Sequence, residues 1–230
     1  MIGIIGAMDS EVNGIKSVMT DKTVRTVASV EFCSGTLCGK KVVVAEAGVG
    51  KVNAAVTAQI MILEYNASAV INTGVAGGLE DSLRIGDIVV ADRVAEHDMD
   101  TTPFGDEPGF ITGLERVYMD CDKKIVDILE SSAEEAGMSA MVGLIVSGDQ
   151  FICRDEQRSR LKEVFGAAAA EMEGAAIGHV CVMNGVPFGV IRAMSDCAND
   201  DSISDFPAFE KAAAAKSIEI IKRAVEKMDV

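Results

Sequence analysis

Four carboxylates occupy segments in which a small-molecule enzyme would place an acid, a base and a sugar-binding group. Glu171 and Glu173 lie in the segment AEMEGAA, where alanine and glycine leave space beside them. Asp196 ends a long apolar run, and Glu11 comes shortly after another apolar run at residues 2–7. Around one neutral pocket, Glu11, Glu173 and Asp196 would suit chemistry that needs a general acid, a general base and an acceptor for sugar hydroxyls.

Each of these carboxylates also has an ordinary structural explanation. A glutamate in an alanine-rich helix usually points to water, and Asp196 could simply cap a helix. The functional interpretation is favoured because Glu11, Glu173 and Asp196 follow three different predicted strands. In α/β sheets, ligands bind outside the carboxyl ends of the strands, so these side chains can meet at one site.

Apolar runs that predict strands alternate with amphipathic segments that predict helices. Strands are expected at residues 2–7, 27–36, 41–45, 69–72, 87–94, 142–146, 168–172 and 188–193. Helices are expected at residues 10–19 (capped by Asp9 or Ser10), 51–65, 122–136, 154–165, from about 174, and at 206–228. This order predicts a single-domain, three-layer α/β fold with a central mixed, largely parallel sheet covered on both faces. The polar or glycine-rich segments that follow strands, at residues 8–11, 73–78, 147–152, 171–174 and 195–196, should then converge on one site.

Two glycine-rich segments lack the spacing of known phosphate-binding loops. In GVGKV, at residues 48–52, Val52 stands where a phosphate loop has the Ser or Thr that binds magnesium. This segment is therefore expected to start a helix, with Lys51 in solvent. TGVAGG, at residues 73–78, lacks the GxGxxG spacing of a dinucleotide site. It is expected to be a loop that either lines a pocket with its amides or forms a plain tight turn.

Composition excludes several classes of partner. The net charge of −15 over 230 residues would repel nucleic acid, and MIGIIGAM is too short and uncharged to be a leader peptide or a membrane span. Six cysteines without a CxxC pair favour reduced thiols in a cytoplasm. The two histidines, His97 and His179, have no metal-like spacing, so we expect no metal and no cofactor, and a structural hydrogen bond for His97.

Seven motifs in a fixed order carry a resemblance that covers nearly the whole chain. They are IGIIGAMDSEV, GVGKVNAA, INTGVAGGL with IGDIVV, HDMDTTPFG, GLIVSGDQFI, AEMEGAAIGHVC and VPFGVIRAMSD. Together they resemble the 5′-methylthioadenosine/S-adenosylhomocysteine nucleosidases of the purine nucleoside phosphorylase superfamily. The resemblance implies hydrolysis of the N-glycosidic bond between adenine and a 5′-thio-substituted ribose, without a cofactor.

The resemblance also implies residue roles. Glu11 matches the base that activates water, Asp196 the acid that protonates adenine N7, and Glu173 the acceptor for the ribose 2′- and 3′-hydroxyls, while Glu171 is expected to have a supporting or structural role. Phe151 matches the residue that stacks on adenine, and the backbone of Ile152 matches the group that binds the purine edge. Met172 is expected at the ribose, Phe206 as a lid over the 5′ group, and Ser195 and Arg192 beside the acid and the water. Further substrate contacts are implied for Met8, Val49 and Val75. Phe104 lies in a loop that a neighbouring subunit lends to the site, so the resemblance implies a homodimer.

Two positions depart from the family pattern, and three other functions stay open. Val75 replaces a serine of many relatives, and Asp106 stands where some relatives have an aromatic residue, so both affect the expected substrate preference. A nucleosidase for futalosine-type nucleosides would use the same machinery. A nucleoside phosphorylase would need cations for phosphate, whereas the first three strand ends offer only Lys51. A binding module without chemistry would not need Glu11 and Asp196.

Overall fold

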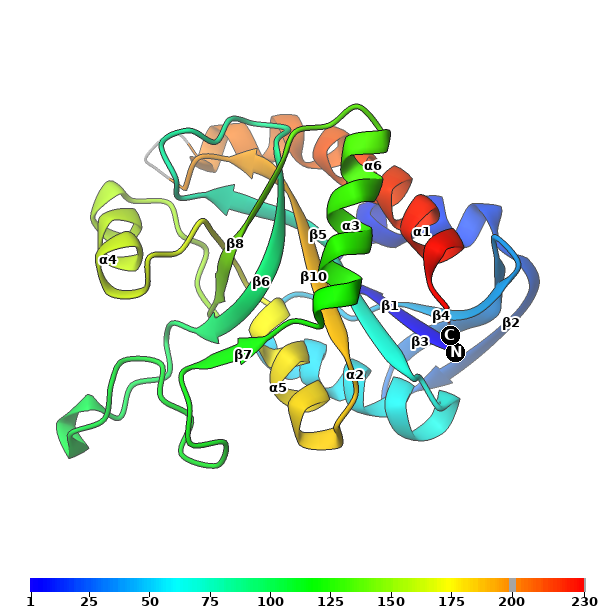
Figure 1. Cartoon of the computed structure of the whole chain (residues 1–230), viewed down its shortest axis with the longest axis horizontal. Coiled ribbons are helices and arrows are strands. Elements are labelled where there is room, and N and C mark those ends of the chain that lie inside the picture. The colour runs from blue at the N-terminus through cyan, green and yellow to red at the C-terminus, as the bar shows by residue number, and fades with distance from the viewer. Residues whose placement is uncertain (199–201, 230) are drawn as a thin grey trace.

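A ten-stranded mixed sheet forms the centre of the computed structural model, which describes residues 1–198 and 202–229 (Figure 1). Its strands are β1 (Ile2–Gly6), β2 (Thr20–Val27), β3 (Val30–Leu37), β4 (Lys40–Glu46), β5 (Ala69–Gly78), β6 (Ile88–Glu96), β7 (Tyr118–Asp120), β8 (Ala140–Ser147), β9 (Ala169–Glu171) and β10 (Phe188–Asp196). The helices are α1 (Asp9–Val18), α2 (Lys51–Tyr65), the short 3-10 helix η1 (Thr102–Phe104), α3 (Lys123–Glu135), α4 (Asp155–Phe165), α5 (Gly174–Asn184) and α6 (Ser202–Lys227).

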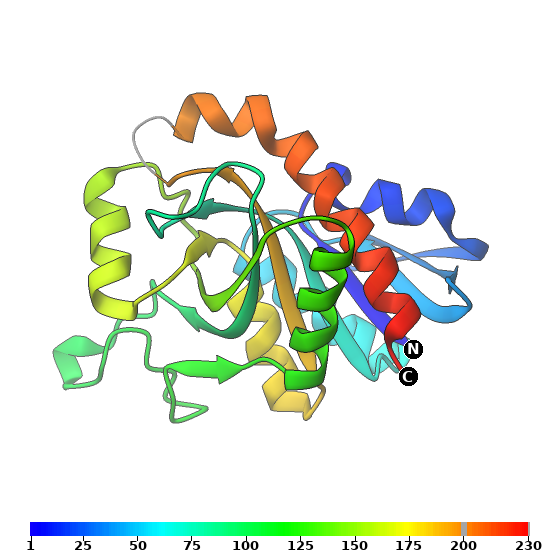
Figure 2. The same cartoon turned by 45° about the horizontal axis from the view of Figure 1, so that its top comes forward.

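Helices cover both faces of this sheet. Helices α1 and α3 both pack against α6 on one side, and α2 packs against α5 on the other (Figures 1 and 2). Strands β1 and β5 are buried at every residue, which explains why they read as continuous apolar runs rather than as alternating patterns. The predicted three-layer α/β fold with a central mixed sheet is confirmed.

Part of the sheet closes on itself around β5. This strand pairs in parallel with β1 and β10 and antiparallel with β9. Because β10 also pairs with β6, β6 with β8, and β8 with β9, five strands form a closed ring of pairings. The register places Gly77 opposite both Ala170 of β9 and Asp196 of β10. The closure therefore brings the ends of β5, β9 and β10 to one place.

The sequence prediction was wrong about TGVAGG, which is the second half of strand β5 rather than a loop. Its glycines have ordinary backbone angles, since none of Gly74, Gly77 and Gly78 has a positive φ. The small size of these glycines, rather than any turn-forming conformation, is what the structure uses. Strand β10 is likewise longer than expected and runs through Asp196.

Two strands and two helix starts also differ from the prediction. Strand β2 and the short β7 were not predicted; β2 is an edge strand with no buried residue, so it lacks the alternation that marks a half-buried strand. Val27 ends β2 instead of starting the next strand, and the turn follows at residues 28–29. Helix α1 has Met8 at its N-cap, so Asp9 and Ser10 lie inside it, and α6 begins at Ser202.

None of the helices in the described part of the chain is long and apolar enough to cross a membrane.

Candidate active site

Segments at the ends of six strands (β1, β4, β5, β8, β9 and β10), together with Phe206 of α6, enclose one cavity of about 270 Å³, close to the lower end of the usual range for small-ligand pockets. Its lining includes the predicted residues Met8, Glu11, Val49, Val75, Phe151, Ile152, Met172, Glu173, Ser195, Asp196 and Phe206, together with Glu171. Arg192 and Phe104 do not line it. The predicted convergence of the strand ends is confirmed.

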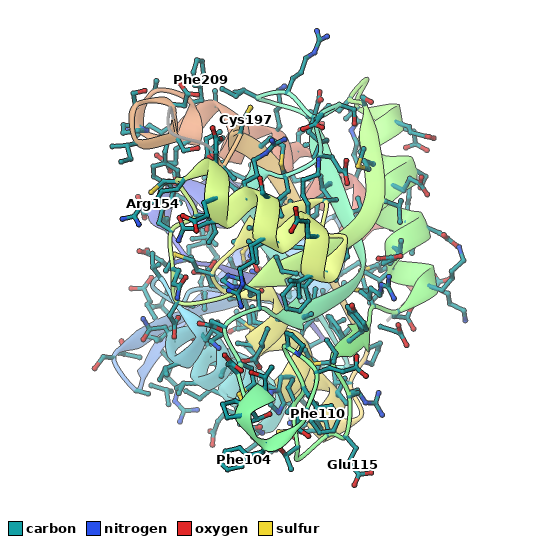
Figure 3. The ribbon with its side chains drawn as sticks, turned by 90° about the vertical axis from the view of Figure 1, so that its left-hand side faces the viewer. Phe104, Phe110, Glu115, Arg154, Cys197 and Phe209 are labelled. Carbon is teal, nitrogen blue, oxygen red and sulfur yellow. The ribbon has the colours of Figure 1, made fainter. Side chains whose placement is uncertain are left out.

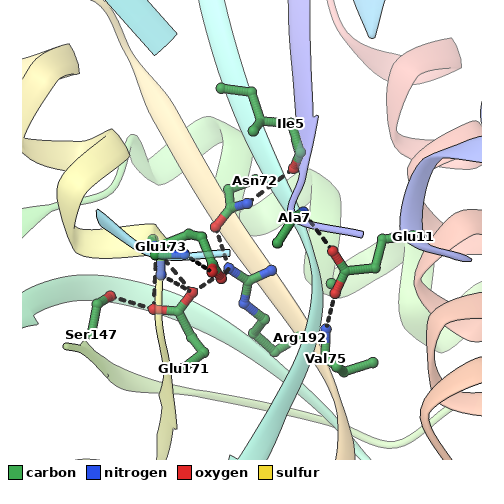
Figure 4. Close-up of polar contacts among 12 residues, drawn as sticks. Ile5, Ala7, Glu11, Asn72, Val75, Ser147, Glu171, Glu173 and Arg192 are labelled. Carbon is green, nitrogen blue, oxygen red and sulfur yellow. Dashed lines mark hydrogen bonds and ion pairs between the residues drawn. The ribbon is translucent and has the colours of Figure 1, made fainter. Parts of the chain in front are cut away.

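Glu11 is held at the start of α1 by three backbone amides. Its Oε2 accepts hydrogen bonds from the N–H groups of Ala7 at 2.6 Å and Met8 at 3.0 Å, and its Oε1 accepts one from Val75 at 3.1 Å (Figure 4). The side chain is buried. Burial raises the pKa of Glu11, although the Arg192 charge and the three N–H groups act to lower it. A fixed carboxylate with a raised pKa is suited to act as a base near neutral pH.

The glycines of β5 allow two carboxylates to approach the strand closely. A Cβ atom on Gly74 would lie 2.5 Å from Glu11 Oε1 and closer still to Arg192 Nη1. A Cβ on Gly77 would lie 2.9 Å from Asp196 Oδ1. Of the two expectations for TGVAGG, a pocket lined by amides and a plain tight turn, the structure favours the pocket, because the N–H of Val75, the residue after Gly74, donates to Glu11.

Arg192 lies fully buried behind the cavity wall and gathers the acidic groups around it. Its Nη2 donates to Asn72 Oδ1 and to Glu171 Oε2, and it lies 3.7 Å from Glu173 Oε2 (Figure 4). Its Nε and Nη1 have no hydrogen-bond partner among the described residues, and Nη1 is the atom that approaches Gly74. Nη1 is thus an unused donor on the side of Glu11.

Glu171 is bound to the protein rather than directed at a ligand. Its carboxylate accepts hydrogen bonds from Ser147 Oγ, from Arg192 Nη2, and from the backbone N–H groups of Glu173 and Gly174 at 2.8–3.0 Å. It therefore holds the first turn of α5 and fixes the backbone of Glu173. These contacts agree with the predicted supporting role.

Glu173, the N-cap residue of α5, keeps more of its carboxylate available. Its Oε1 accepts a hydrogen bond from the Gly50 N–H at 2.9 Å. Burial and the neighbouring charge of Glu171 raise the pKa of Glu173 to about 7, against the lowering effects of Arg192 and the Gly50 N–H. Near neutral pH this carboxyl group therefore changes between its charged and neutral forms.

Asp196, at the end of β10, is also buried and doubly held. Its Oδ2 accepts a hydrogen bond from Ser195 Oγ at 2.9 Å, and its Oδ1 accepts one from the Ala198 N–H at 2.8 Å. Asp196 also lines the cavity. The hydroxyl of Ser195 fixes the carboxyl plane.

Aromatic and aliphatic side chains supply the rest of the cavity wall. The rings of Phe151 and Phe206 meet edge to face with centroids 5.5 Å apart. Ile152, Val75 and Met172 also line the cavity. A flat apolar molecule with polar edges would fit between this wall and the carboxylates.

Phe104 lies outside this cavity. It is 88% exposed on η1, and in Figure 3 it lies at the opposite end of the view from Cys197, the residue after Asp196. It therefore does not reach the cavity of its own chain.

The sequence interpretation of Lys51 was wrong. The Lys51 ammonium is mostly buried and binds Glu96 Oε2 at 2.8 Å and Asp98 Oδ1 at 2.6 Å, so it is not in solvent. The buried His97 Nε2 lacks a hydrogen-bond partner among the described residues. No cluster of three or more metal-binding side chains occurs in the described ranges 1–198 and 202–229.

Sequence reasoning missed two residues that shape the site, Gly50 and Asn72, and it placed the segment 147–152 at the site without giving Ser147 a role. Asn72 donates to Ile5 O at 2.9 Å and accepts from Arg192, which satisfies both ends of its buried amide. An asparagine at the end of an apolar strand was the available signal, because a buried polar side chain needs partners. Gly50 gave no signal, since its contact with Glu173 joins residues 123 positions apart.

Comparison with known proteins places this site in a family. A model described as the phosphorylase superfamily matches residues 1–226. The 5′-methylthioadenosine/S-adenosylhomocysteine nucleosidase of Staphylococcus aureus (strain JH9) is 41% identical over 229 residues, which cover 99% of this chain and 100% of the relative. The chain belongs to this nucleosidase family.

Solved structures of family members have the same fold. An S-adenosylhomocysteine nucleosidase from Streptococcus pyogenes, in complex with 5-methylthiotubericidin, has a TM-score of 0.95 at 37% identity and covers 100% of this chain and 97% of its own. The nucleosidase from Neisseria meningitidis, in complex with methylthio-immucillin-A, has a TM-score of 0.96 at 35% identity, with 99% of each chain covered. A futalosine hydrolase from Helicobacter pylori has a TM-score of 0.95 at 33% identity, covering 99% of this chain and 97% of its own.

The close approach at Gly74 can be tested by adding one methyl group. We expect Gly74→Ala to lower the free energy of unfolding by about 2 kcal/mol, because the methyl group must displace Glu11 and Arg192. Gly113→Ala is the matched control, since a Cβ there meets no atom within 4 Å. Denaturant unfolding of both variants measures the difference; equal stabilities would refute the role assigned to Gly74.

The two neighbouring glutamates should differ in their effect on stability. Glu171→Gln leaves Arg192 with a weakened buried partner and should lower the free energy of unfolding by about 3 kcal/mol.

Glu173 holds its proton more tightly in the folded state than in the unfolded state. Its contribution to stability is therefore complete below pH 4.5 and is lost as the pH rises through about 7. Glu173→Gln should remove this decline. Urea unfolding at pH 5 and pH 8 tests the Glu171→Gln and Glu173→Gln variants, with Glu64→Gln at an exposed position as control. If the stability of Glu173→Gln still fell between pH 5 and pH 8 as in the wild type, the raised pKa of Glu173 would not be the cause of that fall.

Proposed function

We propose that this enzyme hydrolyses the N-glycosidic bond of 5′-methylthioadenosine and S-adenosylhomocysteine, and of 5′-deoxyadenosine as well, releasing adenine and the 5′-substituted ribose. The observation that supports this most directly is the meeting of Glu11, Glu173 and Asp196 from three chain segments at one cavity beside Phe151. The membership of the nucleosidase family over the whole chain agrees with it.

Asp196 is proposed to be the general acid. The adenine anion is a poor leaving group, so a proton given to N7 lowers the barrier, and a positioned proton transfer is worth ~10²–10⁴ in rate. Ser195 and the Ala198 N–H hold the two carboxyl oxygens and set the direction of the transfer. Ser195 is thus a positioning residue for the acid.

Glu11 is proposed to be the base that takes a proton from the attacking water. Its raised pKa favours this step, and the buried Arg192, whose Nη1 lies on the same side of Gly74 as Glu11, is proposed to orient Glu11 from behind the cavity wall. Val75 offers no hydroxyl there, but its backbone N–H still fixes Glu11.

Glu173 is proposed to accept hydrogen bonds from the ribose 2′- and 3′-hydroxyls. A carboxylate near the ring also stabilises the positive charge that develops on the sugar as the bond to adenine breaks. Met172 is proposed to pack against the ribose, Phe151 to stack on adenine, and the Ile152 backbone to read the purine edge. Phe206 would cover the 5′ group, with Met8 and Val49 at the same wall.

A phosphate-dependent reaction is disfavoured by the charges at the site. Lys51 is occupied by Glu96 and Asp98, and the Arg192 Nη2 is occupied by Asn72 and Glu171. Glu11 at the cavity would repel phosphate. A futalosine-type substrate stays an alternative, because a structure of a futalosine hydrolase from Helicobacter pylori shares the fold.

A homodimer is proposed as the working form. Val52, Val56 and Leu63 lie on one face of α2 and are 73%, 40% and 67% exposed, and Met183 on the adjoining α5 is 68% exposed. An exposed apolar face of this kind marks an interaction site. Phe104 would then reach the cavity of the second copy, which accounts for its exposure.

The acid can be tested by replacing its ionisable group alone. Asp196→Asn should lower adenine release ~10²–10⁴-fold with ligand binding retained, because the amide cannot give a proton. The assay uses methylthioadenosine, adenosylhomocysteine, 5′-deoxyadenosine and a futalosine-type nucleoside, each with and without phosphate. The exposed Asp127→Asn serves as control. Unchanged release in Asp196→Asn would exclude this acid, and release that requires phosphate would exclude hydrolysis.

The homodimer can be tested by placing a charge on the α2 face. We expect Val52→Glu to shift the protein from dimer to monomer in sedimentation velocity and to reduce activity, because each cavity loses the lent loop. Val24→Glu is the matched control, since Val24 is a similarly exposed apolar residue on the edge strand β2. A monomeric wild-type enzyme with full activity would contradict the proposal.

A further inference from the structure

Lys51 forms a charged network that the reaction described above does not use. Its side chain is 19% exposed, and its ammonium group lies between Glu96 Oε2 and Asp98 Oδ1. Burial alone would raise the pKa of Glu96, but His179 and Lys51 lower it to about 2, so Glu96 stays charged. Desolvating such a group is costly unless its partners are well placed. A charged network that is largely buried does little for solubility, so a structural or functional role is the better explanation for it.

The network joins two loops into one unit through Asp149. The second oxygen of Asp98 accepts a hydrogen bond from the Asp149 N–H at 2.9 Å. In return, the Asp149 carboxylate accepts one from the backbone N–H of Lys51 at 2.7 Å. Side chain and main chain of Lys51 thus close a ring with Asp98 and Asp149. The ring fastens the glycine turn before α2 to the loop that follows β8.

Both fastened loops contact the proposed catalytic wall. The Gly50 N–H, directly before Lys51, donates to Glu173 Oε1 at 2.9 Å. Gly50 has a φ of +101°, a conformation that favours glycine, so its N–H direction depends on how this turn is held. On the other loop, the Gly148 N–H donates to the backbone carbonyl of Glu171 at 3.2 Å, and Phe151 follows three residues later.

The network also reaches the helix that begins beside Glu173. The second oxygen of Glu96 pairs with His179 Nδ1 at 2.9 Å, and His179 lies on α5. Glu96 therefore ties Lys51 to the same helix whose N-cap is Glu173. Two routes, one through Gly50 and one through α5, connect the ammonium to this carboxylate.

We propose that Lys51 is a positioning residue for the nucleosidase reaction: with Asp98 and Asp149 it holds the Gly50 N–H against Glu173, so that one carboxylate oxygen is fixed and the other is left for the ribose hydroxyls. This inference rests on the proposed function. It assigns to the lysine of the GVGKV segment a purpose other than phosphate binding.

Lys51→Met tests the role of the ammonium. We expect kcat for adenine release to fall ~10- to 100-fold, the effect of losing one aligned hydrogen bond to a charged group, while KM changes much less. Lys123→Met is the matched control, because Lys123 also pairs with a carboxylate, Asp127, but is 84% exposed. Equal kcat values for Lys51→Met and Lys123→Met would overturn the proposal.

The pH dependence of kcat distinguishes a positioning role of Lys51 from a simple loss of stability, because a loss of stability would not shift the acidic limb of the profile. Glu173 is faced by Glu171 from β9, Arg192 from β10, Glu11 from α1 and the Gly50 N–H before α2. The Gly50 N–H favours the charged form of Glu173, so its displacement in Lys51→Met should move the acidic limb of kcat to higher pH. An unshifted limb with reduced kcat would also overturn the proposal.

Asp149 provides a second test if Lys51→Met folds poorly. Asp149→Asn keeps an oxygen that can accept from the Lys51 N–H and should retain most of the activity, whereas Asp149→Ala should lose it as Lys51→Met does. Equal activities of the two Asp149 variants would count against the network.

Hydrogen exchange at the Gly50 amide separates this proposal from the proposed function. Protection of that amide should decrease in Lys51→Met and Asp149→Ala but not in Lys123→Met. If the wild-type enzyme releases no adenine from any of the nucleosides, the proposed function fails while the exchange result still tests the positioning. Unchanged protection in all variants would refute the positioning.

Discussion

The buried guanidinium of Arg192 is the interaction on which the rest of the site depends. Glu171 and Glu173 both lie within ion-pair distance of it, and its charge acts to lower the pKa of Glu11. Without a cation, several carboxylates in so little solvent would have to be neutral, because isolated buried charges are too costly. Arg192 occupies the middle of β10, the strand that closes the ring of pairings with β5 and β6. The same strand therefore closes the sheet and places the cation that balances the buried carboxylates.

Small residues make this arrangement possible. Gly74 and Gly77 of β5 leave room for Arg192, Glu11 and Asp196 against the face of the strand. Backbone N–H groups then supply hydrogen bonds that hold each carboxylate at a fixed place, and donors that are fixed in advance need no reorganisation during a reaction. The result is a cavity with carboxyl groups in different environments on one side and an aromatic wall on the other. Different environments for neighbouring carboxyl groups are the usual basis for dividing acid, base and binding roles.

Two general rules made much of the site predictable from sequence. Strand–helix alternation indicates a sheet covered on both faces, and the rule that ligands bind at the carboxyl ends of strands brings Glu11, Glu173 and Asp196 together. The same reasoning failed at TGVAGG, because a glycine is equally suited to a turn and to a close approach, and only the neighbouring strand distinguishes them. It also failed at β2, since an edge strand without a buried face leaves no alternation in the sequence.

The sequence by itself determined the chemical groups, their order and the family, because motif order and residue type are local properties of the chain. Only the tertiary structure decided how neighbours of similar type divide their roles. Glu171 and Glu173 are two residues apart, yet the first is bound by Ser147 and Arg192 while the second meets the Gly50 amide. Lys51 likewise became a member of a buried network through partners some 45 to 98 positions away. Such contacts follow from the closure of the sheet, and no local pattern in the sequence records them.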